Sequence, residues 1–512
     1  MSTQAEKKRI AKNTIVLYIR MLLTLFVSLY TSRVVLSALG VEDYGIYNVV
    51  GGIVSMFSII SGSLSTSISR FITFELGTGK IDKIKKVFST SIIIQFILCI
   101  IILIVAETVG LWFLNNKMNI SEIRMYSANW VFQLSIVTFI LNLISVPYNA
   151  AIIAHEKMSA FAYISIVEVV FKLIIAYLIT ISPIDKLIFY AILQTIVAFI
   201  LRVIYMIYCK KNFLECTVKY LFDKSLIKQM FGFAGWNFIG SISFLLKDQG
   251  VNIILNIFCG SFVNASRAIS MQINGAVNGF VSNFITAINP QITKSYAEQN
   301  ITYLNTLIIK GTKFSFFLLL IISVPVIANT EYVLSLWLKE VPKYSVEFVQ
   351  LILLLSLTDV LYRPLLTAHL ATGKIKKLQL YVGGLNMLIL PVSAYILYLG
   401  FEPTFTVIIS IIFSIITLFI RLKLYAQIES FDISTFLNYV ILNVFIVSVL
   451  LFFIVYNINI HFKNLNLVTF ISLSGLYIFI SIIIISVFGF SREERGMIYR
   501  KVSFFIKKKQ KE

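Results

Sequence analysis

Residues 86–108 read KVFSTSIIIQFILCIIILIVAET, and this stretch decides the class of fold. Between Lys86 and Glu107 it carries no charged side chain over twenty consecutive residues. An α-helix needs about 20 predominantly apolar residues to cross the hydrocarbon core of a bilayer. We therefore predict a transmembrane helix here, because a chain in lipid has to satisfy its backbone hydrogen bonds internally.

The composition extends this prediction to the whole chain of 512 residues. Hydrophobic residues make up 58%, charged residues make up 13%, and the mean hydropathy is +0.89. A typical soluble domain has about 25% charged residues, so an ordinary multidomain soluble protein is excluded. The apolar run that follows Lys12 is too long for a cleavable signal peptide, and we expect it to stay in the membrane.

Apolar segments of spanning length occur fourteen times, which predicts an all-α integral membrane fold with about fourteen transmembrane helices. The predicted spans are residues 13–38, 44–66, 86–108, 124–148, 158–181, 186–208, 230–257, 267–290, 305–328, 346–370, 376–399, 403–425, 436–457 and 466–488. Glycine and proline punctuate the connections between them, as at Gly40, Pro183 and Gly400.

The basic residues are distributed unevenly over the two ends of these spans. With the N-terminus in the cytoplasm, 32 of the 44 Lys and Arg residues fall on the cytoplasmic side, 7 on the opposite side and 5 inside spans. Because cytoplasmic loops are enriched in Lys and Arg, both termini are predicted to be cytoplasmic, in a bacterial inner membrane. The net charge of +20 then faces anionic lipid, and nucleic-acid binding is not expected.

A weak internal repeat divides the chain. A shift of 220 residues aligns Gly40 with Gly260 and Ile72-Thr73 with Ile292-Thr293. A shift of 217 aligns one P-x6-A-x2-K pattern with another, Pro147, Ala154 and Lys157 with Pro364, Ala371 and Lys374. The repeat predicts two six-helix bundles, 1–222 and 223–430, followed in 431–512 by two helices and a basic cytoplasmic tail. Parallel repeats of this kind place a substrate at their interface, around an axis along the membrane normal.

Polar side chains form stripes on several predicted helices. The first helix presents Asn13, Arg20, Thr24, Ser28 and Thr31 on one face. The seventh presents Asn237, Ser241, Asp248 and Asn252, and the eighth presents Gly275, Asn278, Ser282, Thr286 and Asn289. Small and hydroxyl-bearing residues also allow close helix packing, so packing and substrate contact are both open interpretations of the eighth helix.

Five basic residues lie within predicted spans: Arg20, Arg33, Lys172, Lys247 and Arg363. A cation at the centre of a bilayer costs about 2.5–3.5 kcal/mol on insertion scales, so it normally faces a partner or a wet cavity. Lys172 follows Glu168, and Arg363 follows Asp359, by four residues, a spacing that predicts ion pairs on one helix face. Arg33 lies close enough to a helix end for its side chain to reach water.

Arg20, Lys247 and Arg363 are the residues we predict to bind a substrate through their charge. Arg20 and Lys247 lie on equivalent helices of the two bundles, without an acidic residue at that spacing. Phosphate and pyrophosphate attract Arg through bidentate hydrogen bonds and Lys as a point charge. Neutral hydrogen bonds suitable for sugars are predicted from Thr24, Asn252 and Asn278.

Two carboxylates, Asp248 and Asp359, are candidates for coupling transport to Na⁺ or H⁺. Their alternative role is to neutralise neighbouring cations. Catalytic patterns are absent from the sequence: His155, His369 and His461 lie far apart, and no HExxH motif occurs. The four cysteines form no CxxC pair, so we expect no metal site, no cofactor and no enzymatic activity.

Two segments carry a family resemblance. The first runs from Asn13-Thr14 through Thr31-Ser32-Arg33-Val34-Val35-Leu36 to Leu39-Gly40-Val41-Glu42-Asp43-Tyr44-Gly45-Ile46-Tyr47. The second is Asn289-Pro290-Gln291-Ile292-Thr293-Lys294-Ser295-Tyr296-Ala297, which contains a P-x-I-(S/T)-K pattern. Together with the helix count, they resemble the MOP superfamily, specifically its Wzx-type polysaccharide flippases.

This resemblance implies alternating access that carries an undecaprenyl-pyrophosphate-linked oligosaccharide to the periplasmic leaflet. The oligosaccharide is a unit of O-antigen lipopolysaccharide, capsule or exopolysaccharide. The resemblance also implies a cationic central cavity, to which we assign Arg20, Lys247 and Arg363. Expected partners are membrane lipids, Na⁺ or H⁺, and proteins of polysaccharide assembly.

Two alternatives remain open. A MATE-type drug/cation antiporter resembles this chain in its twelve-helix core. Its N-terminal half typically carries acidic cation sites, however, whereas the first helix here carries Arg20 and Arg33 without an acid. A membrane-embedded glycan polymerase or ligase needs a large outward loop, and the longest one predicted is only near 329–345.

Overall fold

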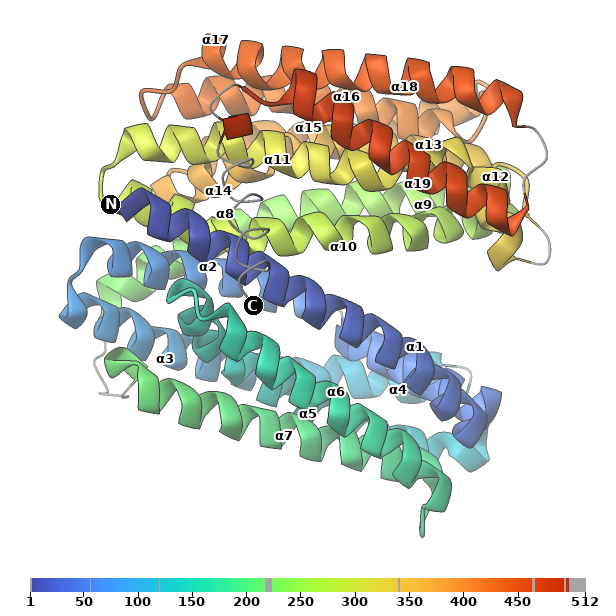
Figure 1. Ribbon diagram of the computed structural model, residues 1–512. Coiled ribbons are helices and arrows are strands. Elements are labelled where there is room, and N and C mark those ends of the chain that lie inside the picture. The colour runs from blue at the N-terminus through green and yellow to red at the C-terminus, as the bar shows by residue number, and fades with distance from the viewer. Residues whose placement is uncertain are drawn as a thin grey trace, which may run out of the picture. The chain divides into compact units, whose positions relative to one another are not determined.

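The computed structural model describes residues 2–55, 57–118, 120–216, 223–338, 341–462, 466–491 and 494–496. Its regular structure within these ranges is helical, without a β-strand. The first nine helices are α1 (Ser2–Ser55), α2 (Ser58–Thr78), α3 (Ile81–Val105), α4 (Leu111–Lys117), α5 (Glu122–Ala154), α6 (Met158–Leu178), α7 (Lys186–Asn212), α8 (Lys224–Leu245) and α9 (Val251–Cys259). They are followed by α10 (Ser261–Ala297), α11 (Ile301–Ala328), α12 (Thr330–Trp337), α13 (Ser345–Val360), α14 (Arg363–Thr372), α15 (Lys376–Tyr398), α16 (Phe405–Ala426), α17 (Ile433–Phe436), α18 (Asn443–His461) and α19 (Leu467–Ile484) (Figure 1).

Eleven helical segments of the described residues are long and apolar enough to cross a membrane. The three other predicted spans lie in α1, in α1 and α2, and in α10. Serine, threonine and asparagine residues make α2 less apolar than α3, and α10 less apolar than α11, because α2 and α10 carry the polar stripes. The fold class predicted from the sequence, an all-α integral membrane protein, is therefore confirmed.

Backbone conformation supports the internal repeat. Eight described residues have a positive φ, and six of them form three pairs at the offsets of the repeat. The pairs are Gly40 with Gly260 and Gly79 with Gln299, which are 220 residues apart, and Glu156 with Gly373, which are 217 apart. Because a positive φ is uncommon outside glycine, equivalent turns have been kept in both halves of the chain. At Gly40 (φ 81°) this conformation separates the first two spans within α1.

Packing divides the chain into two compact units. The first consists of residues 1–242, 286–300 and 370–376, and the second of residues 243–285, 301–369 and 377–512. The ends of α10 and α14 therefore pack with the N-terminal part of the chain. The bundle boundaries at 222 and 430 stay a prediction from the repeat.

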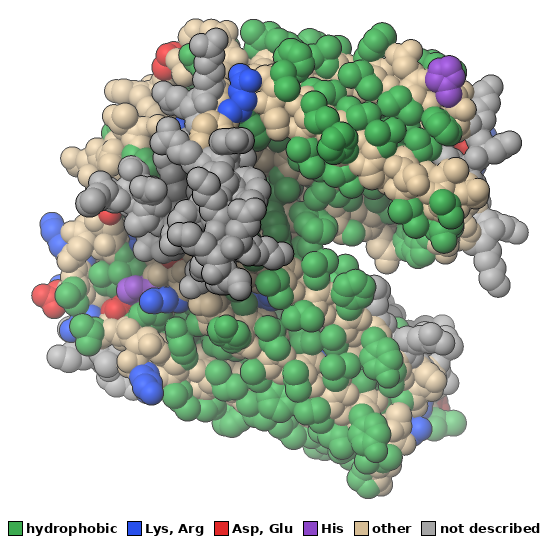
Figure 2. Space-filling model, in the orientation of Figure 1, with side chains coloured by type: hydrophobic (Ala, Val, Ile, Leu, Met, Phe, Trp, Pro, Cys, Tyr) green, Lys and Arg blue, Asp and Glu red, His purple; other side chains and the backbone are tan. Residues whose placement is uncertain are grey.

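The helices keep an apolar surface. In the first unit α5 packs against α7 and α2, and α1 packs against α6; in the second unit α13 packs against α16, and α11 against α19. Large side chains stay exposed on these helices, such as Phe26, Phe96 and Phe445. Figure 2 shows hydrophobic side chains over the visible helix surfaces, with charged side chains gathered toward helix ends. Extensive apolar surface of this kind marks contact with lipid, and the chain is a multi-pass membrane protein.

Candidate functional site

Arg363 anchors a polar network inside the second unit. Its Nη2 donates to Oδ1 of Asn278 at 3.2 Å. Asn278 in turn donates to Oδ1 of Asn274 at 2.7 Å and to Oγ of Ser356 at 3.0 Å, and Ser356 donates to Asn274 at 2.7 Å. The network joins α10, α13 and α14, and its members other than Arg363 are uncharged. The predicted residues Arg363 and Asn278 are therefore in direct contact.

Asp359 does not pair with Arg363, so this sequence prediction is wrong. The helix is interrupted between Val360 and Arg363, because Pro364 has no N–H to donate to the carbonyl of Val360. Asp359 instead accepts a hydrogen bond from Oγ of Ser414 at 2.6 Å. The i,i+4 geometry that the spacing implied is lost at this turn.

The second carboxylate, Asp248, lies in a π-helical turn between α8 and α9. Its Oδ1 accepts a hydrogen bond at 2.8 Å from Arg267 on α10, which is 8% exposed. Lys247 and Asn252 are half-buried, and Lys247 has no ion pair among the described residues. Asp248 thus neutralises the charge of Arg267. Lys247, on the same π-helical turn, keeps a positive charge without an acidic partner among the described residues.

Arg20 lies in the first unit, on the face of α1 that packs against α6. Its guanidinium stacks over the ring of Phe161, with 4.4 Å from Cζ to the ring centroid. Glu168 is near enough to interact electrostatically, but within the described part of the chain Nε of Arg20 has no hydrogen-bond partner. Thr24 is turned toward its own helix, since its Oγ1 donates to the Arg20 carbonyl at 2.8 Å.

The predicted pair of Glu168 and Lys172 is confirmed, with Oε1 and Nζ 2.7 Å apart. Both residues lie on α6, and an uninterrupted helix keeps the i,i+4 spacing. The side chain of Arg33 lies outside the described residues. Of the five basic residues expected within spans, Lys172 is therefore neutralised by Glu168. Three others have no acidic partner at hydrogen-bond distance among the described residues: Arg20, Lys247 and Arg363.

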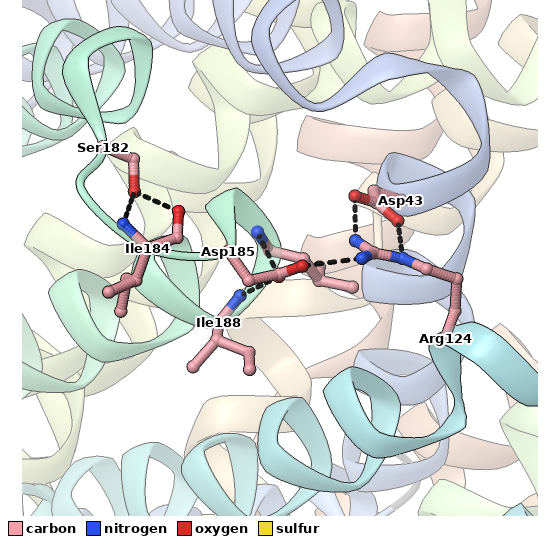
Figure 3. A network of polar contacts seen from close by, with 7 residues as sticks. Asp43, Arg124, Ser182, Ile184, Asp185 and Ile188 are labelled. Carbon is pink, nitrogen blue, oxygen red and sulfur yellow. Dashed lines mark hydrogen bonds and ion pairs between the residues drawn. The ribbon is translucent and has the colours of Figure 1, made fainter.

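A charged cluster holds the N-terminal end of α5 (Figure 3). Arg124 donates from Nε to Asp43 Oδ1 at 2.7 Å and from Nη1 to Asp185 Oδ2 at 2.6 Å. Asp185 also caps α7 by accepting from the backbone N–H groups of Leu187 and Ile188. Partial burial raises the pKa of Asp185, but the hydrogen bond from Arg124 and these N–H groups outweigh it, so the pKa lies below its ordinary value.

The opposite end of α5 carries a second cluster, formed by Asn13, Glu156, Gln291 and Lys294. The side chain of Glu156 is completely buried. Its carboxylate accepts from Nε2 of Gln291 at 2.7 Å and from Nζ of Lys294 at 2.8 Å, while Asn13 donates to its backbone carbonyl at 3.2 Å. We call these four residues the Glu156 cluster. It ties the start of α1 and the loop after α5 to the end of α10.

Arg70 makes a comparable contact with the end of α14. Its Nε and Nη2 donate to the carbonyls of Leu370 and Ala371, both at 2.9 Å. The guanidinium also lies over three phenylalanine rings, those of Phe71, Phe74 and Phe233. A cation at a helix C-terminus is favourable, because the last carbonyls of a helix lack partners and carry partial negative charge.

Sequence spacing did not identify Arg70, Arg124, Glu156 or Arg267 as site residues. The predicted span 44–66 ends too early, since α2 extends to Thr78, and the predicted span 267–290 begins too late, since α10 begins at Ser261. Arg70 therefore lies outside the predicted spans, and Arg267 lies at the first residue of one. In the described part of the chain, no group of three His, Cys, Asp or Glu side chains is arranged to hold a metal ion.

The comparisons with known proteins agree with a helical membrane architecture. The profile of a family described as "Polysaccharide biosynthesis protein" matches residues 10–296. An uncharacterized membrane protein of Bacillus subtilis (strain 168), EpsK, is 19% identical over 253 residues, which are 49% of this chain and 50% of that protein. The chain thus matches about half the length of this curated relative.

Solved transporter structures share the fold. A MATE protein in complex with MaL6 superimposes with a TM-score of 0.71 at 13% identity, over 82% of this chain and 96% of that one. A MOP superfamily transporter from Pyrococcus furiosus, described as having a binding pocket of reverse polarity that suggests a different function, gives 0.67 at 15% identity over 83% and 97%. At such identities the likeness establishes the fold, which is that of the MOP superfamily.

Proposed function

Because the chain belongs to the family of polysaccharide biosynthesis proteins, we propose that it transports the lipid-linked oligosaccharide from which a surface polysaccharide is assembled. The proposed cargo is an undecaprenyl-pyrophosphate-linked unit of O-antigen, capsule or exopolysaccharide, as for Wzx-type flippases. Transport proceeds by alternating access in the bacterial inner membrane, with both termini in the cytoplasm. The family and the fold are of transporter type, and the proposal includes no catalytic step.

The observation that carries this proposal is the Arg363 network. Arg363 lies within a segment apolar enough to span the membrane, and its guanidinium donates a hydrogen bond to a neutral amide, that of Asn278. Its charge is therefore not cancelled by a carboxylate at hydrogen-bond distance within the described residues. A cation at membrane depth is costly unless it serves a ligand or a wet pathway, and Arg binds phosphate groups through two parallel hydrogen bonds.

The other predicted residues extend this role. Within the described residues, Lys247 supplies a second cation without an ion pair in the second unit, and Arg20 supplies one in the first unit whose Nε–H has no hydrogen-bond partner. In the proposal these three cations attract the pyrophosphate. The neutral groups that we assign to hydrogen bonds with the cargo are those of Thr24, Asn252 and Asn278.

We assign ion coupling to Asp248 and Asp359. Asp248 can exchange its bond with Arg267 for a bound cation or a proton, and Asp359 is held by the hydroxyl of Ser414. Protonation or Na⁺ binding at either carboxylate would change the local charge by one unit. Such a change inside a membrane is large enough to bias a conformational equilibrium.

The proposal is tested by glycan export. Arg20→Ala and Lys247→Ala are expected to abolish display of the surface glycan while protein levels stay normal. Lys172→Ala is the matched control, because Lys172 is already neutralised by Glu168. Normal display in both single variants would overturn the assignment of these cations.

The antiporter alternative rests on the shared fold alone, since the MATE structures are 12–14% identical. It predicts export of cationic dyes from cells that produce the protein. Dye export without movement of a pyrophosphate-linked lipid in proteoliposomes would favour the antiporter. Movement of the lipid without dye export is the result we expect.

A further inference from the structure

A small pocket lies inside the first unit, between the second part of α1 and helices α5 and α7. Its volume is about 200 Å³, and it is lined by Tyr47, Gly51, Val54, Leu134, Ser135, Thr138, Phe139, Asn142, Ala191 and Gln194. Thr138 is the middle residue of α5, so the pocket sits at the middle of a membrane-spanning helix. Transporters of this class bind substrate near the bilayer midplane.

None of the residues that line this pocket is charged. Five of them carry neutral hydrogen-bonding groups, and the others are apolar or glycine. A phosphate would find no cation there, and a purely apolar ligand would leave amides unpaired in a low-dielectric setting, at a cost of about 1–3 kcal/mol each. The lining therefore matches a neutral ligand that carries both hydroxyl groups and an apolar face.

Several of the polar groups are fixed in place, and others are available. Gln194 Nε2 donates to Tyr190 Oη at 3.0 Å, and the rings of Tyr47 and Tyr190 meet edge to face with centroids 4.7 Å apart. By contrast, Ser135 and the exposed Asn142 have no hydrogen-bond partner among the described residues. The pocket thus combines a rigid aromatic wall with two unused hydrogen-bonding side chains.

We infer that this pocket binds one neutral sugar residue of the transported oligosaccharide, a role that rests on the proposed function. Sugar hydroxyls match the Ser135 and Asn142 side chains, and the apolar face of a sugar ring matches Phe139 or Tyr47. The volume supports a single residue, because sites for drug-sized ligands occupy about 300–1,000 Å³. Pyrophosphate binding by the cations and sugar binding by this pocket are then separate parts of recognition.

Gly51 offers a way to fill the pocket without disturbing the helices. A Cβ added at Gly51 meets no atom within 4 Å, and its φ is not positive, so Gly51→Leu would extend into open space. Gly475 on α19 also has no atom within 4 Å of an added Cβ, and it belongs to the second unit and not to the pocket lining. Gly475→Leu therefore adds the same side chain elsewhere and serves as the matched control.

The experiment compares two carriers in proteoliposomes: undecaprenyl pyrophosphate alone, and the same lipid bearing a neutral hexose disaccharide. Gly51→Leu is expected to slow transport of the glycosylated carrier about tenfold, the loss of roughly one or two hydrogen bonds, and to leave the bare carrier unchanged. Gly475→Leu should transport both carriers normally. An unchanged rate for the glycosylated carrier, or an equal loss for both carriers, would overturn the pocket assignment.

A second readout separates this inference from the proposed function. Binding of the free disaccharide to the purified protein is measured by saturation-transfer NMR, for the wild type and for Gly51→Leu. If the wild type moves neither carrier, the proposed function fails. Loss of disaccharide binding in Gly51→Leu alone would then still support the pocket, and equal binding in both proteins would overturn it.

Discussion

Removal of the Lys294 side chain should reveal how strongly the Glu156 cluster stabilises the protein. The side chain of Lys294 is 18% exposed and that of Glu156 is completely buried, and Nζ of Lys294 lies 2.8 Å from Oε1 of Glu156. Lys294→Met removes a cationic partner from a buried carboxylate that still accepts a hydrogen bond from Gln291. Breaking a buried pair in this way costs about 3–5 kcal/mol, and we expect the lower limit because Gln291 still donates at 2.7 Å.

The assay is reversible unfolding of the purified protein in mixed micelles, followed by circular dichroism. A loss of about 3 kcal/mol lowers the equilibrium constant for folding roughly 150-fold, at about 1.4 kcal/mol for each factor of ten. Glu156→Gln combined with Lys294→Met should cost clearly less than the sum of the single changes, since the unpaired charge is removed. Lys228→Met is the control, because Lys228 is exposed and has no ion pair among the described residues; its expected effect is within about 0.5 kcal/mol.

A change below 0.5 kcal/mol for Lys294→Met would refute this reasoning. So would strict additivity in the double variant, because independent effects mean that the two charges do not interact. A loss of the same size in Lys228→Met would show that the methionine substitution itself destabilises the protein. Each of these outcomes is distinguishable from the predicted pattern by comparing the wild-type protein with the four variants.

Three further predictions concern other parts of the chain. The pKa of the Asp185 carboxylate is lowered in the folded protein, so its ionised form stabilises the protein above about pH 4, and this stabilisation is lost as the pH falls through the pKa of the folded state. Unfolding temperatures measured from pH 7 to 3 should fall accordingly. Asp185→Asn should lack this part of the pH dependence, because an amide at position 185 does not titrate. Asp248→Asn should remove the dependence of transport on an ion gradient, and an unchanged dependence would count against coupling at this residue. Gly77→Val should destabilise the folded protein by about 1–3 kcal/mol, since a Cβ at position 77 would lie 2.6 Å from the Cβ of Ala297 at the end of α10. Gly62→Val is the control and should be tolerated, because a Cβ at position 62 meets no atom within 4 Å. Equal unfolding temperatures for the two variants would contradict this prediction.

The fold was predictable because a chain in lipid has to satisfy its backbone hydrogen bonds internally. Segments of about 20 apolar residues in a bilayer become helices, and the equivalent glycines Gly40 and Gly260 both adopt a positive φ, of 81° and 80°. The pair of Glu168 and Lys172 was predictable for the same reason, since an unbroken helix fixes i,i+4 neighbours. Local spacing succeeds wherever the local backbone is regular.

Spacing failed where the backbone is irregular or the partners are distant in sequence. Pro364 interrupts the helix after Val360, but the apolar pattern of residues 346–370 predicts one continuous span through this proline. Arg124 reaches Asp43 and Asp185 across 81 and 61 residues, and Lys294 reaches Glu156 across 138. Such contacts depend on how helices pack, which a single sequence does not encode as a periodicity.

The two halves of the repeat hold their equivalent loops with different contacts, a carboxylate at Glu156 and backbone carbonyls beside Gly373. Glu156 and Gly373 are equivalent positions with a positive φ, yet only Glu156 has a side chain that can meet a cation. At Gly373 an added Cβ would lie 2.6 Å from Nη2 of Arg70, so the arginine occupies that space and bonds to backbone carbonyls instead. A carboxylate at position 373 would displace Arg70, whereas a glycine at 156 would leave Lys294 without its acidic partner. Each loop residue and its cation are therefore constrained together, so the halves could diverge in sequence while keeping the same helix ends in contact.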